Sequence, residues 1–150
     1  MDLNLRRESS LRFIHLIHEA TRDRVLQNQK IQDLLETDCV DINHVNSRGP
    51  LLNALLVTIN NGNFYWTHFL LQNGANPLIP FQLDDHIYYY HFTLSQLRLL
   101  LLFGLPLSVI YSDLHYMKPS IRLYVRENRW PKEALLYLFL KKGLDCFLLS

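Results

Sequence analysis

Apolar residues recur along the chain in short runs, and most of these runs end at a glycine. One run precedes Gly74, a leucine-rich run over 93–102 precedes Gly104, and a third over 132–140 precedes Gly143. Runs that close on Leu-Leu or Phe-Leu in this way are typical of amphipathic helices. A glycine after the last turn is a common helix stop, because it adopts the left-handed conformation without a steric penalty. The pattern therefore predicts successive helices, each followed by a tight turn.

The spacing of these glycines indicates a repeat. Gly104 lies 30 residues after Gly74 and 39 residues before Gly143, and these intervals bracket a period of about 33 residues. A weaker copy over 31–43 ends in Asp-Ile-Asn. A plain bundle of about eight short helices is the alternative, but it does not explain why the glycines recur one helix pair apart. We therefore favour a stack of helix pairs.

One segment resembles a known repeat from its first helix to the start of its hairpin. Residues 53–77, NALLVTINNGNFYWTHFLLQNGANP, align without a gap with an ankyrin repeat. Its opening Asn-Ala-Leu-Leu stands where the family has Thr-Pro-Leu-His, Gly62-Asn63 matches the turn between helices, and Leu70-Leu71 with Gly74-Ala75-Asn76 matches the Leu-Leu-x-x-Gly-Ala-Asp ending. The chain thus resembles the ankyrin repeat family, strongly over these 25 residues and weakly over most of 9–145.

The resemblance implies an all-α, ankyrin-repeat-like solenoid of about four helix–turn–helix units with short hairpin connections. We expect an N-terminal tail over 1–8, a repeat domain over 9–145 and an apolar C-terminal tail over 146–150. The units are expected at about 9–45, 46–79, 80–108 and 109–145.

Within these units the pattern predicts individual helices. The first unit has helices at 11–21, capped by Ser9 or Ser10, and 26–36; the third has its first helix within 82–92; and the fourth has a first helix at 120–128 and a second at 132–142. Thr58 and Ile59 replace the paired alanines that let helices of this family pack closely. We therefore expect the second unit to be locally splayed or repacked.

Aromatic residues gather where the resemblance places the binding surface. In ankyrin repeats the hairpin tips and first helices line a concave face that binds other proteins. The corresponding candidates here are Phe81, His86, Tyr88, Tyr89, Tyr90, Tyr111, His115 and Tyr116. Tyrosine supplies a large contact area at little cost in rotamer entropy. Adjacent helical positions differ by about 100°, so we expect at least one of the three consecutive tyrosines to be exposed, although two of them could fill space in a shortened repeat.

A second candidate surface is basic. It consists of Lys118, Arg122, Arg126 and Arg129, of which the three arginines form one stripe if 120–128 is helical. Such a stripe suits an acidic protein surface, a phosphate or RNA. The favoured interpretation is a solvated face of the last unit, with Glu127 nearby.

Charge is distributed unevenly along the chain. The net charge is +1, and the only formal charges between Pro50 and Met117 are Asp84, Asp85, Arg98 and Asp113. The balance gives no reason to expect nucleic acid or an anionic membrane as partner. The charge-poor middle is either flanked by neighbouring units or a patch that meets a partner.

Cysteine content and hydropathy indicate the cellular compartment of the protein. Cys39 and Cys146 do not make a disulfide framework, so we expect a reducing compartment, the cytoplasm. The longest apolar run, 99–111, is interrupted by Gly104 and Pro106, and it is shorter than the roughly 20 residues that a membrane helix needs. We therefore expect no membrane partner.

The sequence contains few candidates for metal binding or catalysis. His15 and His18 lie one helical turn apart and could share a metal, but no third ligand is evident. His86 and His91 lie five residues apart, which is poor geometry on a regular helix, and Cys39 and His44 are an isolated pair without further ligands. The sequence has no glycine-rich phosphate loop and no Gly-x-Ser-x-Gly nucleophile motif. We expect no metal, no cofactor and no catalytic residues.

The expected function is therefore recognition of a partner protein through the concave face. Degenerate ankyrin repeats with long hairpins are similar to those of large DNA viruses and of bacteria that deliver proteins into host cells. The resemblance implies a host-directed effector or adaptor that acts in the cytoplasm, including the cytoplasm of a host cell. Two alternatives stay open: a structural protein that self-associates through its charge-poor middle or apolar C-terminus, and a small enzyme with a cryptic site.

Overall fold

A computed structural model describes residues 3–37, 39–83 and 87–127 of the 150-residue chain. These residues form helices and no strand, which confirms the all-α prediction for this part of the chain. In chain order the elements are α1 (Leu3–Arg22), α2 (Gln29–Glu36), α3 (Ala54–Asn60), α4 (Phe64–Gln72), α5 (Ile79–Gln82), α6 (Leu94–Leu102), α7 (Leu107–Ser112), the 3-10 helix η1 (Leu114–Tyr116) and α8 (Pro119–Glu127).

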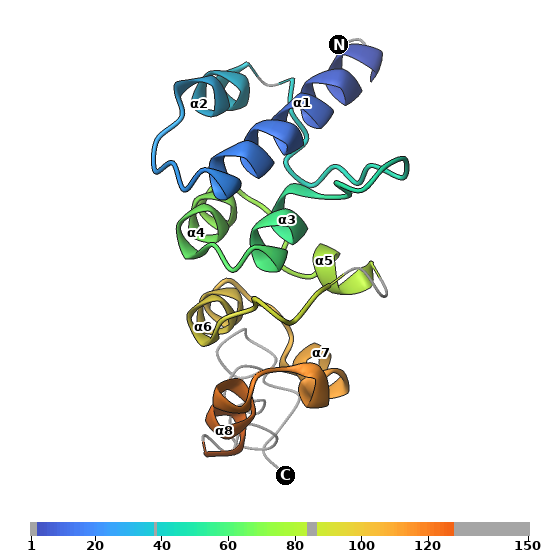
Figure 1. The fold of residues 1–150 in the computed structure, drawn as a ribbon. Helices are drawn as coiled ribbons and strands as arrows, with labels where there is room; N and C mark the ends of the chain where they lie inside the picture. The colour runs from blue at the N-terminus through green and yellow to red at the C-terminus, as the bar shows by residue number, and fades with distance from the viewer. Residues whose placement is uncertain (1–2, 38, 84–86, 128–150) are drawn as a thin grey trace, which may run out of the picture.

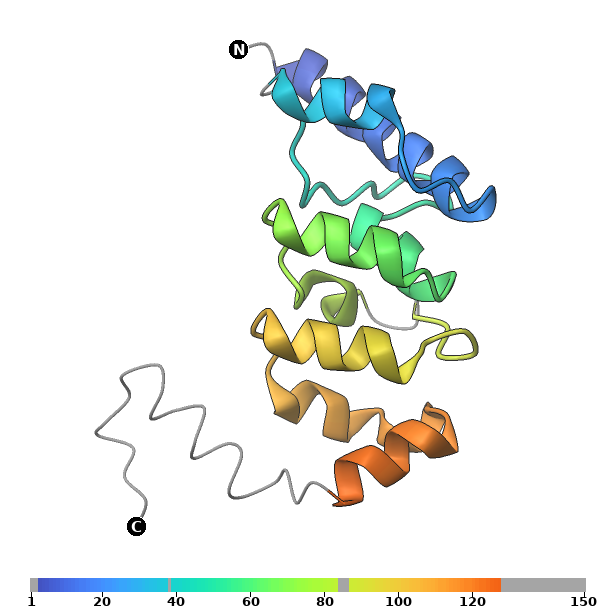
Figure 2. The ribbon, with the colours of Figure 1, turned by 90° about the vertical axis from the view of Figure 1, so that its left-hand side faces the viewer.

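The helices stack in two layers. In one layer α3 packs against α1 and α5, and in the other α6 packs against α4 and α8. The layers are joined where α1 contacts α2 and where α3 contacts α4. Figure 1 shows α3, α5 and α7 along one side of the molecule and α2, α4, α6 and α8 along the other, and Figure 2 shows the same stack from the side of the second layer.

One continuous apolar core lies between the layers. Its fully buried members include Phe13 and Ile17 of α1, Leu55 and Ile59 of α3, Trp66 and Leu70 of α4, Leu97 and Leu100 of α6, Ile110 of α7 and Ile121 of α8. Burying a side chain of this size stabilises the fold by roughly 1.5–3 kcal/mol. The core therefore continues from the first helix to the last described one.

Asparagine and threonine side chains begin the central helices. Asn28, Asn53 and Asn63 accept hydrogen bonds from backbone amides in the first turns of α2, α3 and α4. Thr93 begins α6 in a capping box, in which its hydroxyl accepts from the Gln96 amide while its own amide donates to the Gln96 side chain. Each such cap contributes about 1 kcal/mol.

A buried hydrogen-bonded network surrounds Thr58. Gln96 Nε2 donates to the Thr58 carbonyl at 2.9 Å and to Thr67 Oγ1 at 3.0 Å, and the two threonine hydroxyls are 2.9 Å apart. All three residues are completely buried. The network joins α3, α4 and α6, so the expected departure at Thr58 is a repacking with polar groups.

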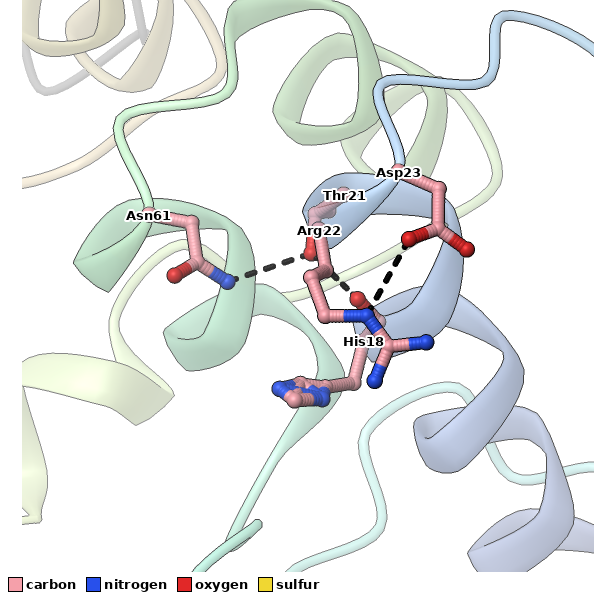
Figure 3. A network of polar contacts seen from close by, with 5 residues as sticks. All are labelled: His18, Thr21, Arg22, Asp23 and Asn61. Atoms are coloured by element: carbon pink, nitrogen blue, oxygen red, sulfur yellow. Dashed lines mark hydrogen bonds and ion pairs between the residues drawn. The ribbon is translucent and has the colours of Figure 1, made fainter.

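Hydrogen bonds also tie the first helix pair to the second. Trp66 Nε1 donates to the Val25 carbonyl at 2.6 Å, and Asn61 Nδ2 donates to Thr21 Oγ1 at 3.1 Å. Figure 3 shows the latter bond beside the Arg22–Asp23 ion pair at the end of α1. In the segments that follow α2 and α4, the Asn76 amide donates to Asn43 Oδ1 at 2.7 Å, across 33 residues of sequence.

The first helix is longer than the sequence predicts. It begins at Leu3, so residues 3–8 are helical and neither Ser9 nor Ser10 caps it. Ser10 is buried inside the helix, where its hydroxyl donates to the Arg6 carbonyl at 2.7 Å and accepts from the Asp41 amide at 2.8 Å. Serine is disfavoured in a helix interior mainly because it competes for backbone groups. Here both of its bonds are compatible with the helix.

The helix pairs α5–α6 and α7–α8 differ from the prediction. The first helix expected within 82–92 is the single turn α5, and 87–92 forms a turn in which the Phe92 amide donates to the Tyr89 carbonyl. The helix expected at 120–128 as a first helix is α8, which packs on α6 in the second layer after α7. Pro106, immediately before α7, is the sequence signal for the missed helix. The helix expected at 132–142 and the tail at 146–150 lie outside the described residues.

Gly62 and Gly74 offer a matched test of the turn between α3 and α4. Both have positive φ values, +65° and +96°, but an added Cβ at Gly62 would collide with the His91 carbonyl, whereas at Gly74 it would meet nothing within 4 Å. We predict that Gly62→Ala lowers the free energy of unfolding by at least about 1 kcal/mol more than Gly74→Ala. Urea unfolding followed by circular dichroism measures both, and equal losses would contradict this packing.

The half-buried His18 predicts an acid-sensitive stability. Burial, together with the nearby positive charge of Arg22, lowers the pKa of His18 below its ordinary value of 6.5. The unfolded chain therefore binds the His18 proton more tightly than the folded chain, and stability falls as the pH drops below 6.5. We predict that His18→Gln reduces the loss of unfolding free energy between about pH 7 and about pH 5. An unchanged loss would show that His18 protonates equally well in the folded state.

Candidate functional site

An aromatic hollow lies between α5, with the loop that follows it, and the segment after α7. Its volume is 770 Å³. We call it the tyrosine hollow, and its lining residues are Pro80, Phe81, Leu83, Ile87, Tyr88, Tyr89, Tyr90, Asp113 and Tyr116. Figure 1 places α5 and α7, which flank these segments, on the same side of the molecule.

The turn over 87–92 is anchored at both ends. At one end the Tyr88 amide donates to Asn60 Oδ1 at 2.8 Å, which ties the turn to the end of α3. At the other end Phe92 is completely buried and is followed directly by Thr93, the cap of α6. A turn of three consecutive tyrosines is therefore held at fixed points against α3 and α6.

A hydrogen bond between Tyr89 and Asp113 closes the base of the hollow. Tyr89 Oη donates to Asp113 Oδ2 at 2.6 Å. Burial, and then the negative charge and hydrogen bond of Asp113, raise the pKa of the Tyr89 hydroxyl far above its ordinary value of 10. Tyr89 therefore stays protonated and remains a donor at neutral pH. The bond joins the tyrosine turn to the residue between α7 and η1.

The other tyrosines face solvent around this bond. The exposed fractions of Tyr88, Tyr90 and Tyr116 are 63%, 81% and 65%. Tyr89 is half-buried, whereas its two neighbours in the turn are exposed. The prediction that at least one of the three is exposed is confirmed, and two are.

The structure brings together five of the eight predicted aromatic and histidine candidates. These five are Phe81, Tyr88, Tyr89, Tyr90 and Tyr116. His115 is exposed and stacks beside Tyr116, with ring centroids 3.9 Å apart, but it does not line the hollow. His86 lies outside the described residues. Sequence reasoning missed the role of Asp113, whose signal was its position as a lone carboxylate in a long uncharged stretch.

Tyr111 points elsewhere. Its side chain packs against the core, and its buried hydroxyl has no hydrogen-bond partner among the described residues. Burial raises the pKa of this hydroxyl above 10. Tyr111 thus packs against the core and does not line the hollow. Its unsatisfied buried hydroxyl destabilises the fold.

The basic candidates lie along α8 and the residue before it. Lys118 and Arg122 are half-buried and Arg126 is exposed, while Arg129 lies outside the described residues. Ile121 and Val125, each one position before an arginine of this set, are the buried residues of α8. Lys118, Arg122 and Arg126 therefore lie on or next to the last described helix, and the tyrosine turn over 87–92 lies earlier in the chain.

The described ranges contain neither a cluster of metal-ligating side chains nor a membrane-spanning helix. Among these residues no three His, Cys, Asp or Glu side chains are grouped closely enough to hold a metal ion. No helix in 3–37, 39–83 or 87–127 combines the length and the apolar character needed to cross a membrane.

Comparisons with protein-family models, with curated proteins and with solved structures found no match to this chain. The site is therefore interpreted from its own geometry and chemistry.

Removing the Tyr111 hydroxyl tests its unsatisfied state. We predict that Tyr111→Phe keeps the ring packing and raises the free energy of unfolding by about 1 kcal/mol, because the desolvated hydroxyl is lost. Urea unfolding of the two proteins measures the difference. A loss of stability of similar size would show that the hydroxyl makes a hydrogen bond in solution.

Proposed function

We propose that the chain is a protein-recognition module that binds a partner protein at the tyrosine hollow. The observation that carries this proposal is the set of three exposed tyrosines, Tyr88, Tyr90 and Tyr116, around a hollow of 770 Å³. Aromatic rings that gather on one exposed surface often mark a protein-interaction site, and tyrosine is enriched in binding hot spots. A rigid base, the Tyr89–Asp113 bond, presents them at fixed positions.

The fold supports the same proposal. We propose that the stacked helix pairs are divergent ankyrin-like repeats in a short solenoid. The resemblance of residues 53–77 to one repeat and the 33-residue spacing of the Asn43–Asn76 hydrogen bond both favour it. Solenoids bind partners along the surface formed by equivalent segments of successive units. In this proposal the hollow, between the loop after α5 and the segment after α7, belongs to such a surface.

The chemistry of the hollow favours binding over catalysis. Among the described residues, its lining contains one carboxylate, Asp113, which already accepts a hydrogen bond from Tyr89, and the other described lining residues are aromatic or aliphatic apart from their tyrosine hydroxyls. We propose a cytoplasmic setting, since the described cysteine, Cys39, is a free thiol. The biological role that we propose is that of a host-directed effector or adaptor, because the degenerate repeats resemble those of large DNA viruses and of bacteria that deliver proteins into host cells.

Peptide display provides the test. A random peptide library would be selected on the wild-type chain alone, with no counter-selection on a variant. We predict that the resulting peptide binds Tyr90→Ala about 30-fold more weakly than wild type, a loss of about 2 kcal/mol, as for a hot-spot tyrosine. Isothermal titration calorimetry measures the affinities.

Tyr65→Ala is the matched control. Tyr65 is also an exposed tyrosine, 40% accessible, but it belongs to α4 in the opposite layer. We expect this variant to bind as wild type does. Equal losses for both variants, or none for Tyr90→Ala in every selected peptide, would contradict recognition at the hollow.

Self-association is a second candidate function, favoured by a separate apolar surface. Leu102, Leu123 and Phe64, with exposed fractions of 79%, 52% and 47%, lie on the second layer of helices or at its helix ends. If this surface makes a dimer, Leu102→Ser should shift the chain from dimer to monomer in sedimentation equilibrium. A wild-type chain that stays monomeric at high concentration would remove this candidate.

A further inference from the structure

We infer that the tyrosine hollow recognises an arginine side chain, presented by a short peptide segment of the partner. The inference rests on the proposed function and names the chemistry of the group that the hollow receives. Its basis is the combination of exposed tyrosine rings with one carboxylate at their base.

The rings supply the first half of the recognition. A cation placed over a tyrosine face, within about 6 Å of its centroid, is attracted by the negative charge density of that face. Tyr88, Tyr90 and Tyr116 line the hollow and are each more than half exposed, with fractions of 63%, 81% and 65%. The chain already makes such a contact internally, because the Arg98 guanidinium lies 5.8 Å from the centroid of Tyr124.

Asp113 supplies the second half. Its Oδ2 accepts from Tyr89 Oη at 2.6 Å, which fixes the orientation of the carboxylate. A carboxylate has about four lone-pair sites on its two oxygens, so one hydrogen bond leaves acceptor capacity for a ligand. None of the described lining residues is Lys, Arg or His.

The charge of the surrounding sequence has the same sign. Between Pro50 and Met117 three aspartates stand against a single basic residue, Arg98. That arginine lies over Tyr124 of α8, which is not a lining residue. A segment with a net negative formal charge attracts a cationic partner and disfavours an anionic one.

Arginine fits this pair of features better than other cations. Its planar guanidinium stacks on an aromatic ring while its in-plane N–H groups donate to a carboxylate. A quaternary ammonium has no N–H group for Asp113, and a lysine ammonium is strongly hydrated. The volume of 770 Å³ is larger than one side chain needs, so residues that flank the arginine in the peptide also find room.

Side-chain probes test the inference directly by NMR. The full chain would carry carbon-13 in its tyrosine rings and would be titrated with N-acetyl-arginine amide, with the uncharged isostere N-acetyl-citrulline amide, and with tetramethylammonium. We expect the arginine probe to shift the ring signals of Tyr88, Tyr90 and Tyr116 with a dissociation constant in the millimolar range, on the order of a few mM for one side chain. The citrulline probe should shift them only at concentrations about tenfold higher.

Asp113→Asn separates charge from shape. The asparagine oxygen can still accept from Tyr89, so the hollow keeps its base while it loses the negative charge. We expect this variant to bind the arginine probe about tenfold more weakly than wild type. Asp33→Asn, which removes an exposed carboxylate of α2, should leave the affinity unchanged. Unaltered backbone spectra in both variants would establish that they fold.

Three results would overturn the inference. These are equal binding of the arginine and citrulline probes, tighter binding of tetramethylammonium than of arginine, and no ring shifts with arginine up to about 50 mM. The display selection distinguishes the source of a failure. Peptides without arginine that still depend on Tyr90 would leave recognition at the hollow intact and refute arginine alone, whereas the absence of any Tyr90-dependent peptide would refute the proposed function as well.

Discussion

The buried hydrogen bonds between Gln96, Thr58 and Thr67 are the interaction on which the rest of the structure depends. Gln96 is completely buried, and its Nε2 donates to both threonines, so α6 has a single register against α3 and α4. Apolar contacts alone tolerate sliding, whereas a buried amide that loses its partners costs about 1–3 kcal/mol for each unsatisfied group. The network thus selects one arrangement of the stack.

The position of the tyrosine hollow follows from that register. Gln96 also completes the capping box with Thr93, and the tyrosine turn ends at the residue immediately before that cap. The turn is fixed to α3 at its other end by the Tyr88–Asn60 hydrogen bond. The same helices that share the buried network therefore hold both ends of the turn, and the Tyr89–Asp113 bond connects it to the next helix pair.

The sequence predicts the α3–α4 pair well and the later pairs poorly, for physical reasons. Asn53, Gly62 and Gly74 mark the start, turn and end of this pair through local backbone preferences, which are readable without the fold. The layer to which α8 belongs depends on its packing against α6, a contact between distant residues that no local signal encodes. Asp113 escaped notice for the same reason, since its bond to Tyr89 spans 24 residues. The exposure of Tyr88 and Tyr90 was predicted correctly but for a different reason, because the prediction assumed a helix and these tyrosines lie in a turn.

Hydrogen exchange measured by mass spectrometry tests the central claim most directly. The chain would be compared alone and saturated with a peptide selected for binding to it. The account predicts new protection over 87–92 and 113–117, with α4 and the exposed face of α8 unchanged, and with slow exchange in α3, α4 and α6 in both samples. Protection confined to α4, α8 or the ends of α6 would contradict recognition at the tyrosine hollow and point to the apolar surface of the second layer.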